Sequence, residues 1–163
     1  MTQSVPNAEM APPLTGGCQC GAMRNTLLDF PDHVSVCYCR MCQKASGGPF
    51  MAFARVKASA LRWTRGAPSL FASSNLVERG FCSRCGTPLT YRFIERGNVS
   101  VTIGSLDDPE SVRPQMQYGV ETAPPWLSSI GAVPRCRPED FIGPELMARF
   151  INYQHPDRDT DGG

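Results

Sequence analysis

Seven cysteines in three short groups are the residues of this chain best suited to chemistry. Zinc binds thiolate sulfur at about 2.3 Å in a tetrahedron, which places the sulfurs about 3.7 Å apart. Cysteines separated by one or two residues reach that distance with little strain. The groups are Cys18-x-Cys20-Gly21, Cys37-x-Cys39-x-x-Cys42 and Cys82-x-x-Cys85-Gly86. This spacing predicts bound metal, with zinc the best match.

The two groups that end in glycine each offer two sulfurs and together complete one closed site. A glycine directly after the second cysteine lets the backbone adopt a positive φ there. Backbone N–H groups in such turns can then donate to the sulfurs and offset their charge. We therefore expect a structural zinc on Cys18, Cys20, Cys82 and Cys85.

The middle group supplies three sulfurs in one run, Cys37, Cys39 and Cys42. Three protein ligands with one free position are the arrangement of a catalytic zinc, so we expect two zinc ions per chain. Two alternatives use the same seven residues, namely a single mixed site and a pair of metals that share sulfurs. A further alternative closes the three-cysteine group with Cys136, a histidine or an acid, which would make both metals structural.

Disulfides and a redox dithiol at Cys82 and Cys85 are the readings without metal. The N-terminus has neither the basic nor the apolar region of a secretory signal, which favours a reducing compartment, by default the cytoplasm. No βαβ pattern surrounds Cys82. Metal therefore remains the preferred interpretation, with Cys136 a spare thiol, His33 an ordinary strand residue and His155 a solvated residue of the tail.

Short strands must position these cysteines. The 163 residues suit one domain, and 15 glycines with 15 prolines indicate a turn-rich chain. Alternating apolar residues predict strands at 33–37, 50–56, 88–94 and 98–103, with a hairpin turn at 96–98. We expect one capped helical turn at 105–110 and a short C-terminal helix from Pro144 to Ile151. The fold class is mainly β, with a lead-in at 1–14, one domain at 15–155 and a flexible tail at 156–163.

The overall charge of the chain gives no sign of a polyanionic partner. The formal net charge is +1, which indicates neither nucleic acid nor an anionic membrane as a partner. No stretch is long and apolar enough to span a bilayer. The sequence gives no indication of an oligomeric state.

The cysteine pattern, with several other motifs, resembles the glutathione-dependent formaldehyde-activating enzyme family, which also contains centromere protein V. The resemblance runs over about 15–134. Its motifs are Gly17-Cys18-Gln19-Cys20-Gly21, Cys37-Tyr38-Cys39-Arg40-Met41-Cys42, Gly47-Gly48-Pro49-Phe50, Phe81-Cys82-Ser83-Arg84-Cys85-Gly86-Thr87-Pro88-Leu89, Gly104-Ser105-Leu106-Asp107-Asp108-Pro109 and Pro125-Trp126-Leu127.

This resemblance implies a tent-like fold of packed antiparallel sheets and the same division of the cysteines between a structural and a catalytic-type zinc. It implies a carbon–sulfur lyase that acts on a glutathione adduct of formaldehyde, or on another thiol adduct of an aldehyde. Many relatives carry a histidine before the tryptophan motif, where this chain has Met116-Gln117-Tyr118. The competing hypotheses are a non-enzymatic binding module with two structural metals and a thiol-based sensor.

Residues near the three-cysteine group suggest supporting roles. Arg40 and Lys44 could offset the thiolate charge or bind substrate carboxylates. Tyr38 could donate a proton or simply pack. Ser46-Gly47-Gly48-Pro49 predicts a turn that lets a substrate approach closely.

Overall fold

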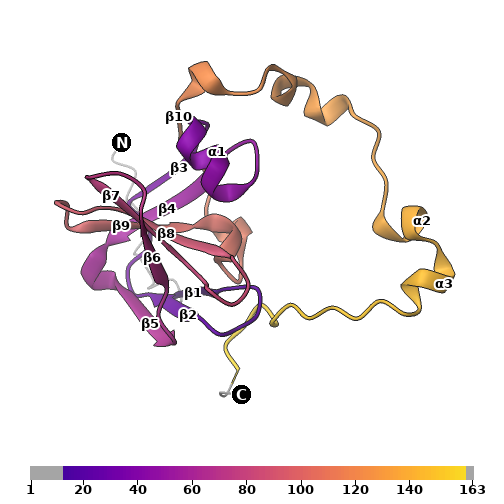
Figure 1. Cartoon of the computed structure of the whole chain (residues 1–163), viewed down its shortest axis with the longest axis horizontal. Coiled ribbons are helices and arrows are strands. Elements are labelled where there is room, and N and C mark those ends of the chain that lie inside the picture. The colour runs from indigo at the N-terminus through magenta and orange to yellow at the C-terminus, as the bar shows by residue number, and fades with distance from the viewer. Residues whose placement is uncertain (1–12, 161–163) are drawn as a thin grey trace, which may run out of the picture.

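Two β-sheets form the body of the protein in a computed structural model that describes residues 13–160 (Figure 1). The smaller sheet has the strand order β1-β2-β5, and the larger has the order β10-β3-β4-β9-β8-β7-β6. The strands are β1 (Leu14–Gly17), β2 (Arg24–Leu27), β3 (His33–Cys37), β4 (Met51–Lys57), β5 (Leu61–Arg65), β6 (Ser69–Ala72), β7 (Val77–Phe81), β8 (Pro88–Phe93), β9 (Asn98–Thr102) and β10 (Met116–Tyr118).

The described helices are all short. Three are α-helical, namely α1 (Arg40–Ser46), α2 (Pro138–Ile142) and α3 (Pro144–Met147). The 3₁₀ turns are η1 (Ala58–Ala60), η2 (Ile103–Ser105), η3 (Pro109–Ser111), η4 (Val120–Thr122) and η5 (Pro125–Ala132). No helix within 13–160 has the length and apolar character needed to cross a membrane.

The mainly β fold class is confirmed, and the four strands expected from alternation are β3, β4, β8 and β9. Strands β8 and β9 pair antiparallel across the expected hairpin. The expectation of purely antiparallel sheets needs one correction, because β10 pairs in parallel with β3. Strands β3 and β10 are far apart in the sequence, and only a long connection allows two strands to pair in the parallel direction.

The main apolar core lies between the two sheets. Leu27 of the small sheet and Val56 and Val101 of the large sheet are almost fully buried in it. On β9, Val99 and Val101 face this core, as the alternation predicts. Burial of these side chains stabilises the body independently of any metal, at about 25 cal/mol per Å² of apolar surface removed from water.

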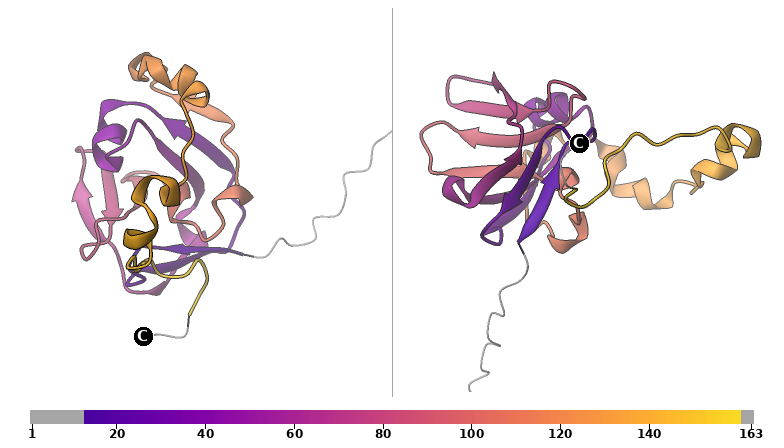
Figure 2. Two further views of the ribbon diagram at one scale, coloured as in Figure 1. Left: turned by 90° about the vertical axis from the view of Figure 1, so that its right-hand side faces the viewer. Right: turned by 90° about the horizontal axis from the view of Figure 1, so that it is seen from below.

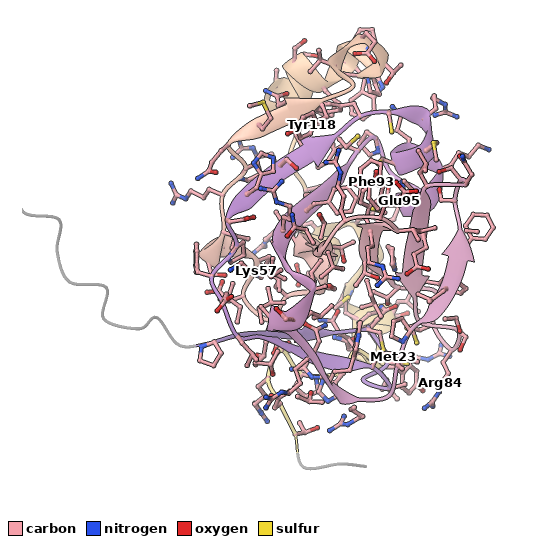
Figure 3. All side chains as sticks on the ribbon, turned by 90° about the vertical axis from the view of Figure 1, so that its left-hand side faces the viewer. Met23, Lys57, Arg84, Phe93, Glu95 and Tyr118 are labelled. Atoms are coloured by element: carbon pink, nitrogen blue, oxygen red, sulfur yellow. The ribbon has the colours of Figure 1, made fainter. Side chains whose placement is uncertain are left out.

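The cysteine groups lie at opposite ends of the body. Strand β10 and helix α1 are at one end, and the β1–β2 turn is at the other (Figure 1). Figure 3 shows the same separation, with Tyr118 far from Met23 and Arg84. Met23 packs against the four-cysteine group, and Arg84 lies within the turn from Cys82 to Cys85.

Helix α1 is not expected from the sequence, which predicts helix only at 105–110 and in the C-terminal region. Its seven residues are too few to show a helical period in the sequence. The side chain of Gln43 fixes it to the rest of the fold by hydrogen bonds. The Gln43 amide nitrogen donates to the carbonyl oxygens of Tyr38 at 2.6 Å and Thr122 at 3.0 Å. The helix ends where Gly47 adopts φ 68°, in the predicted turn.

The C-terminal helix is shorter than expected. Helix α3 ends at Met147 rather than near Ile151, and Leu146, Phe150 and Ile151 are all exposed. An amphipathic helix gains most of its stability from burying its apolar face, and none of the residues of α3 is buried. Residues 125–153 form a wide loop that stands away from the body (Figures 1 and 2).

The chain then returns to the body close to the four-cysteine group. The backbone N–H of His155 donates to the carbonyl oxygen of Gln19 at 2.7 Å, and Asp159 accepts from the buried guanidinium of Arg24. His155 is partly buried, so its expected solvation is wrong. At the other end, Leu14 is already the first residue of β1, and the rest of the predicted lead-in, 1–12, lies outside the described residues, as do 161–163. The domain limits stay predictions.

Candidate metal centres

The four-cysteine group has the sulfur geometry of a tetrahedral metal site. The four Sγ atoms of Cys18, Cys20, Cys82 and Cys85 all lie within 4.8 Å of one another. The Sγ atoms of Cys18 and Cys20 are 3.6 Å apart, and those of Cys20 and Cys82 are 3.9 Å apart. These separations bracket the value of about 3.7 Å that tetrahedral zinc–sulfur bonds require.

Two similar turns hold these sulfurs. The N–H of Gly21 donates to the carbonyl of Cys18 at 3.0 Å, and the N–H of Gly86 donates to that of Cys82 at 2.8 Å. Both glycines have a positive φ, 73° and 78°, as the sequence predicts. The backbone N–H of Met23 donates to Sγ of Cys18 at 3.2 Å, which is the kind of contact that stabilises a ligating thiolate.

The thiols of this group differ in acidity. Burial is the main cause that raises the pKa of Cys18 to about 12. Burial also acts to raise the pKa of Cys85, but hydrogen bonds from Thr87 and the surrounding backbone outweigh it and lower that pKa to about 6. A buried thiol such as Cys18 loses its proton when a cation replaces it, so metal binding here would release protons.

The three-cysteine group lies where β3 meets α1. Cys37 ends β3, Cys39 is the N-cap of α1, and Cys42 is buried in its first turn. Their three sulfurs also lie within 4.8 Å of one another. Gly119 passes close behind, and a Cβ at this position would lie 2.8 Å from the backbone nitrogen of Cys39. Only a glycine allows this approach, which brings the chain after β10 against the cysteine turn.

Acidity varies in this group as well. Burial raises the pKa of Cys42 to about 12, although a hydrogen bond from Arg79 acts in the opposite direction. Burial also acts to raise the pKa of Cys39, but backbone hydrogen bonds from Cys42 and Met41, together with the neighbouring thiols, lower it overall. Backbone N–H groups at the start of α1 thus favour a thiolate at Cys39.

No fourth ligand closes this group among the described residues. No other cysteine, histidine or acid within 13–160 brings a ligand atom to the three sulfurs. Cys136 is exposed, and its thiol contacts the carbonyl oxygen of Arg137. All eight cysteines are free of disulfides, and the seven grouped cysteines form two separate sets. The division into four and three, expected from spacing, is therefore the division seen in space.

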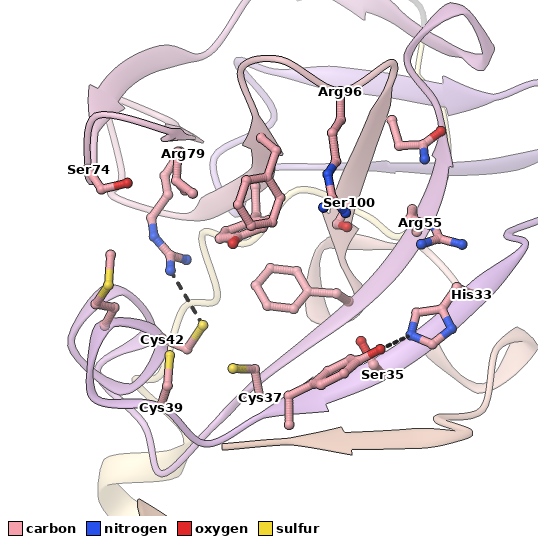
Figure 4. A pocket seen from close by; sticks show the side chains of 17 residues that line it. His33, Ser35, Cys37, Cys39, Cys42, Arg55, Ser74, Arg79, Arg96 and Ser100 are labelled. Carbon is pink, nitrogen blue, oxygen red and sulfur yellow. Dashed lines mark hydrogen bonds between the residues drawn. The ribbon is translucent and has the colours of Figure 1, made fainter. Parts of the chain in front are cut away.

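A cavity of about 470 Å³ opens on the three-cysteine group (Figure 4). This volume lies within the range of about 300–1,000 Å³ typical of small-molecule sites. Aromatic and polar side chains of β3, β4, β7, β8, β9 and β10 line it. Its lining residues that matter for chemistry are Cys37, Cys39, Cys42, Arg79, Tyr91, His33, Arg55, Arg96 and Tyr118.

The end of the pocket away from the cysteines is cationic. Figure 4 shows Arg55, Arg96 and His33 on that side, across from Cys37 and Cys42. Arg55 pairs with Asp32 at 2.9 Å, whereas Arg96 has no acidic partner in the described chain and lies over the ring of Phe93. No aspartate or glutamate lines the pocket. An anionic group would therefore be attracted to this end.

Tyr118, the last residue of β10, lies beside His33 in the pocket. Its hydroxyl lies 3.1 Å from Nε2 of His33, and both side chains line the pocket (Figure 4). His33 is a hydrogen-bonded strand residue, as expected, but it also faces the same cavity as the cysteines. The alternation of β3 could have placed His33, Ser35 and Cys37 on one face, but it could not show what covers that face.

Tyr38, Arg40 and Lys44, for which the sequence suggests supporting roles, do not line the pocket. Tyr38 donates to Oε1 of Gln117 at 3.1 Å and packs edge-on against Phe50, which supports the packing role. Arg40 donates to Oε1 of Gln43, and together with Lys44 it lines a separate surface hollow. The cations that do reach the pocket, Arg55, Arg79 and Arg96, were not singled out from the sequence, and no motif marks them.

The fold and the two cysteine groups define a small mainly β protein with two potential metal sites, one of which has all its cysteines in the wall of the 470 Å³ pocket. Residues 13–122 match the model of a family described as glutathione-dependent formaldehyde-activating enzyme. The chain belongs to that family. The resemblance drawn from the motifs is thereby confirmed.

Two relatives add to this. An uncharacterized lyase of Schizosaccharomyces pombe is 30% identical over 87 residues, which are 53% of this chain and 63% of the relative. The chain thus spans less than two thirds of that relative. A crystal structure of a Rhodobacter sphaeroides protein, 21% identical, has a TM-score of 0.50 and covers 64% of this chain and 98% of its own. That likeness supports the fold alone.

Proposed function

We propose that this protein is a zinc-dependent carbon–sulfur lyase for a glutathione or other thiol adduct of an aldehyde, such as S-hydroxymethylglutathione. One observation carries the proposal. A pocket of small-molecule size opens on three converging sulfurs that have no fourth protein ligand within 13–160. Membership of the family and the lyase name of the yeast relative support the same reaction class.

The cysteines fit zinc in number, spacing and chemistry. Cys18, Cys20, Cys82 and Cys85 would hold a structural ion, and Cys37, Cys39 and Cys42 would hold a second ion with an open position. Bound there, zinc would stabilise a substrate thiolate and polarise a carbonyl oxygen. The second site would be the catalytic one, because all three of its cysteines line the 470 Å³ pocket.

The lyase step breaks the bond between sulfur and the hydroxymethyl carbon. The electron pair of that bond stays on sulfur, the hydroxyl loses its proton, and its oxygen becomes the carbonyl oxygen of the aldehyde. The reverse addition forms the same bond and returns the proton. His33 and Tyr118, joined by their hydrogen bond, line the pocket and can exchange a proton with its contents.

The cationic end of the pocket suits a substrate with carboxylates. Glutathione carries its thiol in the middle of the molecule and a carboxylate at each end. A thiol seated at the cysteines could therefore extend a carboxylate toward Arg96 and Arg55. We place this reaction in a reducing compartment, the cytoplasm by default, where glutathione is abundant and thiols stay reduced.

Cobalt substitution tests the proposal directly. Cobalt replaces zinc at cysteine sites and gives thiolate-to-metal absorption bands. Addition of glutathione should change the bands of one of two metals per chain, and Cys39→Ser should abolish that response. The alternative is a binding module with two structural metals. In that case glutathione would leave the bands of both metals unchanged, and both metals would resist chelators until the protein unfolds.

A further inference from the structure

Arg79 is a buried cation at the three-cysteine group. It lies on β7, and only 7% of its surface is exposed. Its Nη2 donates to Sγ of Cys42 at 3.4 Å, and its Nη1 lies 3.6 Å from Sδ of Met51 (Figure 4 shows the contact with Cys42). Its Nε donates to Oγ of Ser73 at 3.1 Å.

No carboxylate balances this charge in the part of the chain that the structure describes. The arginines paired with acids there are Arg24, Arg55, Arg92 and Arg137. The face of Arg79 packs on the ring of Tyr91, with 4.9 Å from Cζ to the ring centroid. Burial of an unpaired charge is costly, so a buried guanidinium needs an anion nearby. Of the three side chains that accept hydrogen bonds from Arg79, only Cys42 can supply one, as a thiolate.

The charges of the site explain why a cation belongs there. Three thiolates and one zinc ion sum to a charge of minus one. That excess charge opposes entry of a further thiolate and weakens the metal's attraction for a carbonyl oxygen. With Arg79 included, the sum is zero.

We propose that Arg79 is a positioning residue that neutralises the three-thiolate metal centre through Cys42, and thereby retains the metal and admits an anionic sulfur at the open position. This role rests on the proposed function for the metal and the thiol. It adds a residue from the large sheet that supports the centre without ligating it. Partners of this kind that orient and tune metal ligands commonly change metal affinity by about 10–100-fold when removed.

The test uses Arg79→Met and Arg79→Lys in the full chain. Arg79→Met keeps much of the apolar length and removes the charge, while Arg79→Lys restores the charge without the planar fork. Arg92→Met is the matched control, since it removes a cation from the neighbouring strand β8 that pairs with Glu78 and does not line the pocket. Ser73→Ala keeps the charge and removes only the contact to Nε.

The primary readout is the chelator concentration that removes the second metal, measured without any thiol substrate. We expect Arg79→Met to lose this metal at a concentration about 10-fold lower or more, and to shift its cobalt–thiolate bands. Arg79→Lys should recover most of the difference, Ser73→Ala should lie close to wild type, and Arg92→Met should match it. Wild-type retention and bands in Arg79→Met would overturn the proposal.

Folding is measured in parallel by thermal unfolding. If Arg79→Met does not fold, Arg79→Lys is compared with wild type instead. A folded lysine variant that loses the metal at a chelator concentration about 10-fold lower than wild type would refute charge neutralisation. Glutathione titration of the cobalt protein separates the two ideas. If glutathione changes the bands of the wild-type protein and Arg79→Met retains its metal as well as wild type does, only the role of Arg79 is refuted. If glutathione leaves the bands of the wild-type protein unchanged and Arg79→Met loses its metal more easily, only the proposal of a thiol substrate is refuted.

Discussion

The backbone N–H of Gln19 donates to the hydroxyl oxygen of Thr87 at 3.0 Å, which joins two cysteine turns that lie 68 positions apart in the sequence. The same threonine lies 3.2 Å from Sγ of Cys85. The four-cysteine group therefore links the small sheet to the turn before β8, and it does so within a cluster that includes the fully buried Leu89. A metal at this position would reinforce a contact between distant parts of the chain.

Loss of this group should unfold the protein. We expect Cys82→Ser, at a fully buried position, to lower the free energy of unfolding by about 4 kcal/mol or more, because a structural metal contributes directly to folding. Chemical denaturation followed by circular dichroism measures this. Cys136→Ser, at an exposed thiol outside both groups, is the control and should change stability by about 0.5 kcal/mol at most.

The three-cysteine group should behave in the opposite way. Cys39→Ser should abolish turnover of S-hydroxymethylglutathione and reduce bound zinc from two ions per chain to one. Its melting temperature should stay near that of wild type, because Cys39 caps a short helix outside the main core. Equal unfolding by Cys39→Ser and Cys82→Ser would contradict the separation into a catalytic and a structural metal.

Three glycines separate the cost of backbone conformation from that of a side-chain clash. Gly86→Ala forces a non-glycine residue to φ 78° in open space and should cost about 1 kcal/mol. Gly21→Ala adds a Cβ that would lie 2.2 Å from Cδ2 of His155, so it should cost more than Gly86→Ala. Gly97→Ala, with neither constraint, is the control. Urea unfolding should find Gly97→Ala the most stable, Gly86→Ala intermediate and Gly21→Ala the least stable, and equal stabilities would show that these turns tolerate side chains.

Acid should weaken the contact between Arg24 and Asp107. Burial acts to raise the pKa of Asp107, but hydrogen bonds from Arg24 and Thr15 outweigh it and lower that pKa below its usual value. A carboxyl with a lowered folded pKa stabilises the fold above the unfolded pKa of about 3.9, and this contribution is lost as the pH falls through the folded value.

The variant Asp107→Asn tests this pH dependence. It should cost about 3 kcal/mol at pH 7, because it leaves a buried guanidinium with only the half-exposed Asp159 as a partner. The cost should shrink as the pH falls below about 4. Asp140→Asn, which removes an exposed partner of Arg137, should leave the unfolding free energy almost unchanged. A cost for Asp107→Asn that does not vary with pH would exclude this source of acid sensitivity.

Arg96 should govern affinity for the carboxylate of the substrate. We expect Arg96→Ala to raise KM for S-hydroxymethylglutathione by about 10-fold, because a charge-assisted hydrogen bond contributes about 1.5–3 kcal/mol. The uncharged adduct of 2-mercaptoethanol should show no such change. Arg62→Ala, at an exposed position on β5 outside the pocket, is the control. The same KM change for both substrates would mean that Arg96 shapes the pocket without binding a carboxylate.

Local patterns in the sequence determine much of this protein. The spacing of Cys18, Cys20, Cys82 and Cys85 predicts a four-sulfur cluster, because short turns control the distance between neighbouring sulfurs. The positive φ at Gly21 and Gly86 follows from the same turns. Alternation of apolar residues correctly predicts β3 and β9, since side chains in a strand alternate between the two faces. The two turns and the strands each arise within a few consecutive residues, whereas the joining of the two cysteine pairs is inferred because a closed zinc site needs four ligands.

The tertiary structure decided the rest, because those features depend on which distant segments meet. Helix α1 has too few residues to show a period, and Gln43 holds it through carbonyl groups that include that of Thr122. The pocket forms only when β10 joins the edge of β3 and brings Tyr118 next to His33. Nothing in the sequence distinguishes Arg79 from other strand residues. Its contact with Cys42 arises only because the fold places β7 beside the cysteine turn. Pairings between distant segments depend on loop closure and shared burial, and no short sequence window records either.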